Sequence, residues 1–458
     1  MSRRRPKRPA ARRKRRNPPS HSTSGLSDRQ QRYYSRSRRK RHATEDHLDR
    51  GASVQRDDHP MVCAAPPAII TEAAALAELI DHLRTVGRYA FDTEFIGELT
   101  YAPKLCVLQV ATAERVVLVD PLAGVDLAPF WATVVDPSIQ TIVHAGVQDL
   151  EPPWRLTGEL PRNILDTQIA LGFAALPYPL SLREALDVLL GVRLGKSMTF
   201  TQWDRRPLSP SQIRYAADDV RYLPALADEA AQRLEAVGHT TWAAEECAAL
   251  SDEALYRFDP VAQSRRLRGT RNLTARQLGV VVKLLQWRED VARDQNVPPR
   301  TVVRDEALKT LAQKKATSVD ELYGLNVLPR HIIRLHGRQM VEAVREGLAL
   351  DAADLPAVKA QVETSSRRSL IDSVWAVIQA WCFGQAVHPT LVTSRQELVT
   401  LFADGVSADR LTGSRLNQGW RKALLGDVLT AFLQGETTLA FGWDQRVTAH
   451  RPSASGQV

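Results

Sequence analysis

Two acidic residues in one short segment are the first candidates for chemistry. Side chains of an extended chain alternate between faces, so in Phe91-Asp-Thr-Glu-Phe95 the side chains of Asp92 and Glu94 point the same way. Two neighbouring carboxylates on an apolar strand repel each other and lose hydration, and a cation between them removes both costs. The alternative is an exposed edge strand with a solvated acidic face. This segment alone leaves both interpretations open.

A third carboxylate follows a later strand. Thr141-Ile-Val-His-Ala-Gly-Val-Gln-Asp149 is an apolar run that enters a glycine-bearing turn and brings Asp149 just beyond the strand end. In α/β sheets, functional sites gather at such strand ends. The alternative is that Asp149 caps the next helix, a common role for Asp. Asp166 has the same two interpretations, and there the cap is favoured because an apolar helix begins at once.

A tyrosine and a fourth carboxylate lie four residues apart in a helical pattern. Tyr215 and Asp219 therefore share one helix face, although an ordinary amphipathic helix with a core Tyr and a surface Asp has the same spacing. Together, Asp92, Glu94, Asp149 and Asp219 offer four carboxylates in order along the chain. Mg²⁺ and Mn²⁺ are hard ions that prefer oxygen ligands. A pair of such ions suits the displacement chemistry of phosphate esters.

The elements that must hold these residues follow from the periodicity of apolar residues. A helix is expected at 73–86, followed by short apolar runs that are expected to be strands. Helices then dominate. The predicted strands are 89–95, 105–112, 115–120 and 141–144, and the later helices are 165–175, 182–190 and 210–235. This order predicts one α/β domain at 65–250.

Two later segments share an order of features. Each has a helix ending near a tryptophan (Trp287 and Trp381), then a loop that contains proline, then a second helix. We therefore predict two related all-α units at 265–350 and 362–442, followed by a polar tail at 445–458. The alternative is that any two helical hairpins resemble each other.

Charge is distributed unevenly along the chain. The net charge is +9, but residues 1–41 hold 17 of the 61 Lys and Arg and one of the 52 Asp and Glu. Because 1–62 has few apolar residues, we predict a disordered basic arm suited to nucleic-acid phosphates; a solubilising tail and a transit peptide are the alternatives. Segment 265–350 is also basic, with 17 basic and 9 acidic residues. The four cysteines have no zinc-ligand or redox spacing and no run is long enough to span a bilayer, so we expect a cytoplasmic protein.

The ordered motifs resemble the DEDD exonuclease superfamily, which has a ribonuclease H-like α/β fold. Tyr215-x-x-x-Asp219 is typical of its DEDDy branch, because the sister branch has His where this chain has Arg214. The two all-α units resemble HRDC (helicase and ribonuclease D C-terminal) domains, which bind nucleic acid. Further stretches narrow the resemblance to the ribonuclease D family: Leu105–Gln109, His144–Leu150, Asp166-Thr-Gln168, Lys196-Ser and Arg206-Pro-Leu208.

The resemblance implies a 3′–5′ exoribonuclease. In it, Asp92, Glu94, Asp149 and Asp219 hold two Mg²⁺ or Mn²⁺ ions, and Tyr215 orients the attacking water. The implied partners are tRNA precursors or other RNA with 3′ extensions, with no membrane, and nucleoside 5′-monophosphates are released. A 3′–5′ DNA exonuclease in repair has the same motifs, and a non-catalytic RNA-binding protein can retain the fold.

The chain departs from the family pattern directly after the third acid. Pro152 and Pro153 follow Asp149 closely, where the family continues as helix. Proline fits only the first turn of a helix. We therefore expect the helix after Asp149 to start late or to bend.

Overall fold

The computed structural model describes residues 59–97, 99–195, 201–356, 364–443 and 447–451. The predicted basic arm lies almost entirely outside these residues. Lys196 and most of the predicted polar tail lie outside them too.

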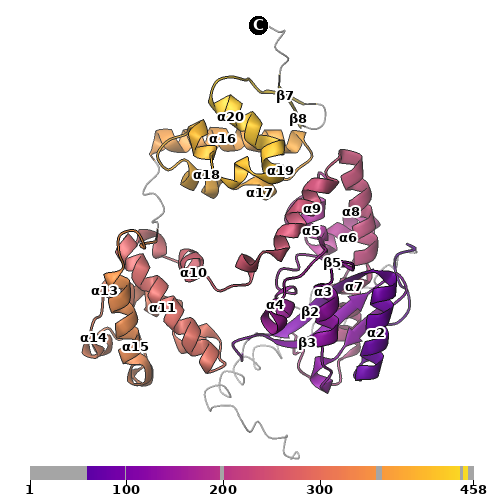
Figure 1. Ribbon diagram of the computed structural model, residues 1–458, viewed down its shortest axis with the longest axis horizontal. Helices are drawn as coiled ribbons and strands as arrows, with labels where there is room; N and C mark the ends of the chain where they lie inside the picture. The colour runs from indigo at the N-terminus through magenta and orange to yellow at the C-terminus, as the bar shows by residue number, and fades with distance from the viewer. Residues whose placement is uncertain (1–58, 98, 196–200, 357–363, 444–446, 452–458) are drawn as a thin grey trace, which may run out of the picture. The chain divides into compact units, whose positions relative to one another are not determined.

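A six-stranded mixed sheet forms the centre of the first folded segment (Figure 1). Its strand order is β1-β4-β3-β2-β5-β6. Strand β3 pairs antiparallel with both β2 and β4, whereas β2, β5 and β6 are parallel to one another, as are β1 and β4. This topology confirms the ribonuclease H-like α/β fold that the motifs implied. The strands are β1 Ala68–Ile70, β2 Arg88–Ile96, β3 Lys104–Ala111, β4 Val116–Val119, β5 Gln140–Val143 and β6 Ile164–Asp166.

Helices cover both faces of the sheet. The helices concerned are α2 Ala73–Val86, α3 Ala128–Val134 and α7 Pro210–Arg221. On one face, the ring of Phe91 meets those of Phe130 and Trp131 on α3 edge-on, with centroids 5.7 and 6.1 Å away. On the other face α7 crosses β2, β3 and β4 and buries Ala216 in a cluster with Leu118. Because Asp92 follows Phe91 on the alternating strand, the acidic face of β2 is the one under α7.

Most predicted elements are present, and the differences have physical causes. The helix predicted at 210–235 is two helices, α7 and α8 (Leu223–Val237), because Pro224 has no backbone N–H to donate to the preceding turn. Strands β1 and β6 were not predicted, since three residues are too few to show a period of two. Helix α3 was also missed. The remaining helices here are α4 Glu151–Thr157, α5 Thr167–Gly172, α6 Leu182–Leu190 and α9 Thr240–Ala248.

A helical segment with a core of its own follows. Leu284, Leu308 and Val344 are fully buried at its centre, as expected for an HRDC domain. Helices α11 and α15 make its largest contact. The bounds are α10 Pro260–Arg266, α11 Ala275–Asp294, α12 Pro299–Val302, α13 Asp305–Lys314, α14 Val319–Gly324 and α15 Arg330–Ala349.

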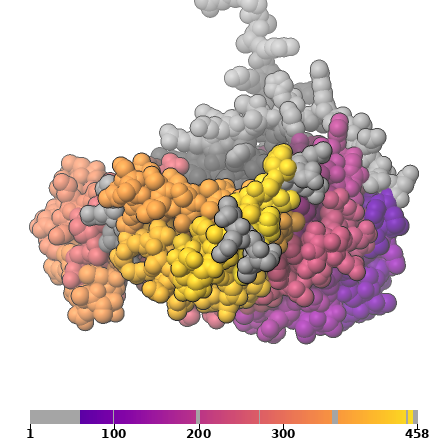
Figure 2. Space-filling view, turned by 90° about the horizontal axis from the view of Figure 1, so that it is seen from above, coloured from indigo at the N-terminus to yellow at the C-terminus, as the bar shows by residue number. Residues whose placement is uncertain are grey.

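The second helical segment begins with the same order of helices and then differs; its surface is coloured orange to yellow in Figure 2. Apart from α10, each segment starts with a 20-residue helix, followed by a four-residue helix that begins with proline. A β-hairpin follows at the predicted end of the all-α unit 362–442 and the start of the predicted polar tail. No single helix of the described residues is long and apolar enough to cross a membrane, and the bent pair Ser365–Gly384 with Pro389–Leu401 passes only by length and composition. The bounds are α16 Ser365–Gly384, α17 Pro389–Val392, α18 Arg395–Leu401, α19 Gly419–Arg421, α20 Asp427–Leu433, β7 Ala440–Trp443 and β8 Val447–His450.

The second helical segment shares an apolar core with the α/β segment. Trp420 is 2% exposed, packs edge-on against Phe173 with centroids 4.7 Å apart, and donates its indole N–H to Glu246 over 2.8 Å. Arg421 pairs with the same carboxylate at 2.7 Å. Backbone hydrogen bonds join the two segments as well. Removing this contact should therefore destabilise the α/β segment.

We expect Trp420→Ala to lower the free energy of unfolding by about 3–5 kcal/mol, the usual cost of truncating a buried tryptophan. Trp443 is 78% exposed, so Trp443→Ala is the matched control. It should change stability by less than about 0.5 kcal/mol. Urea unfolding followed by circular dichroism measures both variants. Equal midpoints would show that the contact contributes nothing to stability.

Candidate active site

Three separate elements bring the predicted site residues together. Strand β2 carries Asp92 and Glu94, the turn between β5 and α4 carries Asp149, and α7 carries Tyr215 and Asp219. Asp92 and Glu94 each lie close enough to Asp149 and Asp219 for those charges to raise their pKa. The structure therefore places all five residues in one cluster.

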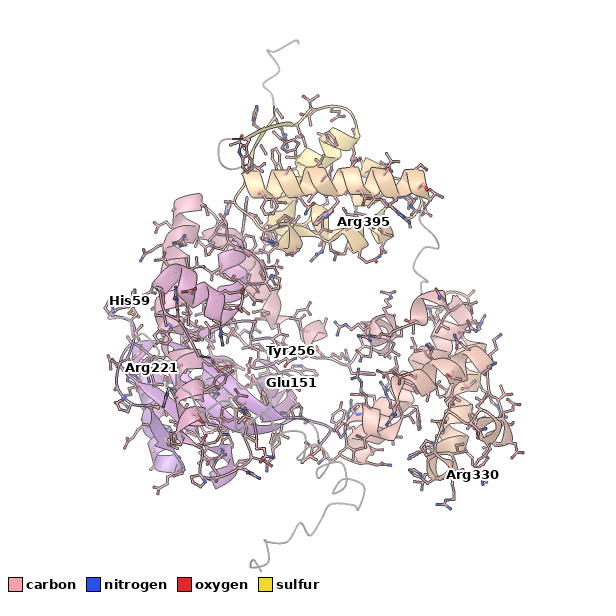
Figure 3. All side chains as sticks on the ribbon, turned by 180° about the vertical axis from the view of Figure 1, so that it is seen from behind. His59, Glu151, Arg221, Tyr256, Arg330 and Arg395 are labelled. Atoms are coloured by element: carbon pink, nitrogen blue, oxygen red, sulfur yellow. The ribbon has the colours of Figure 1, made fainter. Side chains whose placement is uncertain are left out.

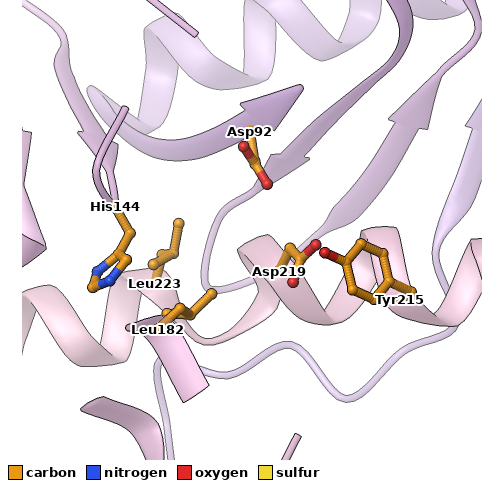
Figure 4. A pocket seen from close by; sticks show the side chains of 6 residues that line it. All are labelled: Asp92, His144, Leu182, Tyr215, Asp219 and Leu223. Atoms are coloured by element: carbon orange, nitrogen blue, oxygen red, sulfur yellow. The ribbon is translucent and has the colours of Figure 1, made fainter. Parts of the chain in front are cut away.

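A cavity of about 160 Å³ opens at this cluster (Figure 4). Acidic, aromatic and apolar side chains from distant parts of the chain line it together. Glu94 and Asp149 do not line the cavity; they lie beside it through their interactions with Asp92. The lining residues are Asp92, His144, Leu182, Tyr215, Asp219 and Leu223.

The turn that carries Asp149 is held in an unusual conformation. Ala145 has a φ of 58°, and a Cβ on Gly146 would lie 2.5 Å from that of Val143, so only glycine fits there. The carboxylate of Asp166 accepts the backbone N–H groups of Ala145 and Gly146 at 3.0 and 3.1 Å. The same carboxylate caps α5, which confirms its predicted role. Asp166 thus fixes the turn from which Asp149 projects.

Helix α4 begins after Asp149. Its N-cap is Leu150, so the interpretation of Asp149 as a helix cap is wrong. Pro152 and Pro153 fall in the first turn, where proline is tolerated, and the predicted late start is confirmed. Tyr256, labelled in Figure 3, stacks on Trp154 of this helix with centroids 6.1 Å apart. The helix is therefore supported from the side.

A threonine that sequence reasoning assigned to the opposite face takes part in the site. The hydroxyl of Thr93 donates to the carboxylate of Asp149, and Asp92 shares a further hydrogen bond with Asp149. Strand β2 has a register shift between Glu94 and Phe95. Strict alternation along the sequence could not show that Asp149 reaches the strand beside Thr93.

Tyr215 is held from two sides. Its hydroxyl hydrogen-bonds with Asp219, one turn later on the same helix. The ring of Trp203 packs beside that of Tyr215 with centroids 6.0 Å apart. The Trp203 carbonyl accepts from Arg206 at 2.7 Å, and Arg206 also pairs with Asp120 at the end of β4. The Arg206-Pro-Leu208 stretch thus anchors the segment that positions the tyrosine.

All four carboxyl groups have raised pKa values, chiefly because burial disfavours their charged forms. The pKa is raised to about 8 for Glu94, about 7 for Asp219 and about 6 for Asp149. Burial, with the charges of Asp149 and Asp219, raises the pKa of Asp92 well above its usual range. Burial also raises the pKa of Tyr215, so its hydroxyl is neutral at pH 7. Without a compensating cation, the four carboxyl groups cannot all be ionised at neutral pH.

His144 lines the cavity and was quoted for the resemblance without a role. Burial lowers the pKa of its imidazole, which favours the neutral ring. Its Nε2–H donates to the Leu180 carbonyl at 2.9 Å, and its Nδ1 hydrogen-bonds with the Thr167 hydroxyl, 2.8 Å away, which also contacts the Val143 carbonyl at 3.1 Å. The Gln168 amide donates to the same carbonyl at 2.9 Å. Both ring nitrogens are engaged, so His144 holds the backbone just before Leu182 and is not free to transfer protons.

The donor set suits a hard divalent cation, since it consists of carboxylate oxygens. As the side chains stand, no three His, Cys, Asp or Glu residues of the described part of the chain are arranged to hold a metal ion. The carboxyl groups of the site bond to neighbouring side chains instead. Asp149 bonds with Asp92 and with the Thr93 hydroxyl, and Asp219 bonds with the Tyr215 hydroxyl.

Family models match the α/β segment and the first helical segment. Residues 67–235 match the 3′–5′ exonuclease family, and residues 265–344 match the HRDC domain. Ribonuclease D of Gluconacetobacter diazotrophicus is 34% identical over 376 residues, which cover 81% of this chain and 94% of that protein. Ribonuclease D of Cronobacter turicensis is 32% identical, over 80% of this chain and 100% of that protein.

A solved structure agrees with these relatives. The crystal structure of Escherichia coli RNase D, described as an exoribonuclease involved in structured RNA processing, has a TM-score of 0.69 and 30% identity. The similarity covers 81% of this chain and 99% of the Escherichia coli chain. A protein from Bifidobacterium adolescentis, 20% identical with a TM-score of 0.58, has the same fold. With this identity over most of its length, the chain belongs to the ribonuclease D family.

Proposed function

We propose that this chain is a 3′–5′ exoribonuclease whose carboxylates Asp92, Glu94, Asp149 and Asp219 hold two divalent ions, Mg²⁺ or Mn²⁺. The observation that carries the proposal is the burial of four carboxyl groups in one cluster, two of them lining a cavity, with raised pKa values. Bound there, such ions supply the acidity that activates water and the charge that stabilises a leaving 3′-oxygen.

Tyr215 is the proposed hydrogen-bonding partner of the attacking water. A neutral phenol contributes little charge to a metal site, so its role is to orient. Its hydroxyl already reaches Asp219, and its ring is fixed beside Trp203. The hydroxyl therefore stays where an attacking water next to Asp219 would need it. Leu182 and Leu223 offer apolar walls for a terminal nucleoside.

RNA with a 3′ extension is the proposed substrate, with tRNA precursors as one class and nucleoside 5′-monophosphates as products. The activity ascribed to the Escherichia coli protein supports RNA over DNA. The free cysteines support an origin in the cytoplasm, where thiols stay reduced. Digestion of 3′-extended tRNA, linear RNA and single-stranded DNA, with Mg²⁺ or with EDTA, tests the proposal. Faster digestion of DNA would favour a repair exonuclease, and no digestion of any substrate would favour a non-catalytic RNA-binding protein.

The first helical segment offers a surface for the RNA backbone. Helix α15 carries exposed arginines at 330, 334, 338 and 345, and their helical spacing places them in one stripe. Arg330 is labelled in Figure 3. The basic arm, with 17 Lys and Arg in residues 1–41, is proposed to add further phosphate contacts. Such contacts hold the strand while the acidic site works on its end.

The raised pKa values predict how stability depends on pH. The folded protein binds protons more tightly than the unfolded chain, whose carboxyl pKa values are near 4. In EDTA, tighter proton binding therefore stabilises the folded protein most below about pH 4. This stabilisation is lost as pH rises through about 6 to 8. Mg²⁺ should restore stability at about pH 8 more than at about pH 5, since it replaces protons. Thermal unfolding at both pH values measures this. Asp219→Asn has one raised carboxyl group fewer, so it should lose less stability as pH rises. A protein in EDTA that becomes more stable as pH rises from about 5 to about 8 would contradict the prediction.

The roles of Tyr215 and Asp219 should separate on substitution. Tyr215→Phe keeps the ring, so we expect kcat to fall by about 10²–10⁴ with metal affinity unchanged. Asp219→Asn removes a proposed ligand, so we expect metal affinity to fall along with kcat. Mn²⁺ titration of turnover and of binding compares the two. Full activity of Tyr215→Phe would make Tyr215 a packing residue only.

The arginine stripe should contribute to the salt dependence of RNA binding. Removing one phosphate interaction with a single strand lowers the slope of log K against log salt by about 0.7. We expect Arg334→Ser and Arg338→Ser each to show this change. Arg84 is exposed on α2, on the sheet face away from the acids, so Arg84→Ser is the matched control and should leave the slope unchanged. Identical slopes for all three variants would exclude the stripe from RNA binding.

A further inference from the structure

Gln109 on β3 is a fully buried amide with no hydrogen-bond partner. Its side chain is 0% exposed, and neither Oε1 nor Nε2 makes a hydrogen bond. Most buried polar side chains in folded proteins are paired, because an unpaired one has lost its hydrogen bonds to water and makes none within the protein. Gln109 therefore opposes folding, and its presence calls for an explanation at the place where it lies.

The register of the sheet places Gln109 beside the proposed metal site. In the antiparallel pair of β2 and β3, Gln109 lies directly opposite Asp92. Directly opposite residues have their side chains on the same face, with Cβ atoms about 4.5–5.5 Å apart. Gln109 therefore lies on the face that carries Asp92 and that α7 covers. The residue opposite it, Asp92, lines the cavity.

The other neighbours of Gln109 offer no reason for an amide. The residue opposite Gln109 on β4 is Leu118. Val107, two residues before Gln109 on β3, lies on the same face. Both belong to the apolar cluster under α7. A side chain of the same shape without polar atoms would pack here at less cost. The acids are the groups on this face that an amide can serve, and Asp92 is the one directly opposite Gln109.

We propose that Gln109 is a positioning residue that donates its amide N–H to Asp92 when Asp92 holds a cation. The Gln109 amide has no hydrogen-bond partner, and the carboxyl group of Asp92 is carried directly opposite it on the neighbouring strand. A carboxylate has two oxygens, so Asp92 can hold a cation with one of them and accept from Gln109 with the other. That bond fixes which oxygen of Asp92 faces the cation. The inference rests on the proposed metal-binding role of Asp92.

The decisive variant is Gln109→Met, which keeps the length of the side chain and removes both polar atoms. Its metal-free form should unfold at a urea concentration equal to or above that of the wild type, because two unpaired polar atoms are gone. Its affinity for Mg²⁺ and Mn²⁺, measured by calorimetry without RNA, should fall about 10–100-fold, as is usual when a residue supporting a metal ligand is lost. Turnover at saturating RNA should fall with it. A merely structural residue cannot gain stability and lose metal affinity in one substitution.

Thr141→Val is the matched control. Thr141 is a fully buried polar residue of β5 opposite Tyr89, on the sheet face turned away from Asp92. This variant should keep the wild-type metal affinity. The variant Asp219→Asn distinguishes a failure of the proposed metal site from a failure of the proposed role of Gln109. If it binds Mg²⁺ like the wild type, the proposed metal site is wrong; if it loses affinity while Gln109→Met does not, only the role of Gln109 is overturned. A Gln109→Met protein less stable than wild type also overturns that role.

Discussion

Four carboxyl groups buried against one another are the constraint on which the rest of this structure depends. Each alone would be ionised at neutral pH in water, yet here burial raises every one of their pKa values. The fold holds them from three independent elements, each anchored separately. The Asp166 carboxylate fixes the turn before Asp149, and Arg206 fixes the segment beside Tyr215. Such anchoring keeps the acids together although burial and their mutual charge both oppose their ionisation.

The sequence predicted the parts of the site that depend on local geometry. Alternation in β2 put Asp92 and Glu94 on one face, and helical spacing put Tyr215 with Asp219; the structure has both. It could not show contacts that depend on tertiary placement. Thr93 lies on the face that alternation assigns away from the acids, yet it donates to Asp149 because the β5–α4 turn reaches the strand there. The metal-holding roles of the acids stay predictions.

The same limit applies to the larger organisation. Two helical segments with the same opening order were expected to be alike, but one has its own core and the other shares a core with the α/β segment. Periodicity shows that a helix has an apolar face, not which neighbour covers it. Trp381 and Trp420 are both buried in the shared core, and only the former belongs to the repeated pattern. The contact with Phe173 comes from α19, beyond the helices whose order the sequence repeats.

The polar groups around the cavity fall into two kinds, and the difference bears on function. His144, Gln168 and Asp166 are satisfied, and their hydrogen bonds all end on backbone or on a neighbouring hydroxyl. Such groups build the walls and have the same partners whether or not anything is bound. Gln109 is buried without a partner, and the four acids are buried against one another. Buried groups of this kind are matched to a bound state, because binding can supply partners that the protein alone does not.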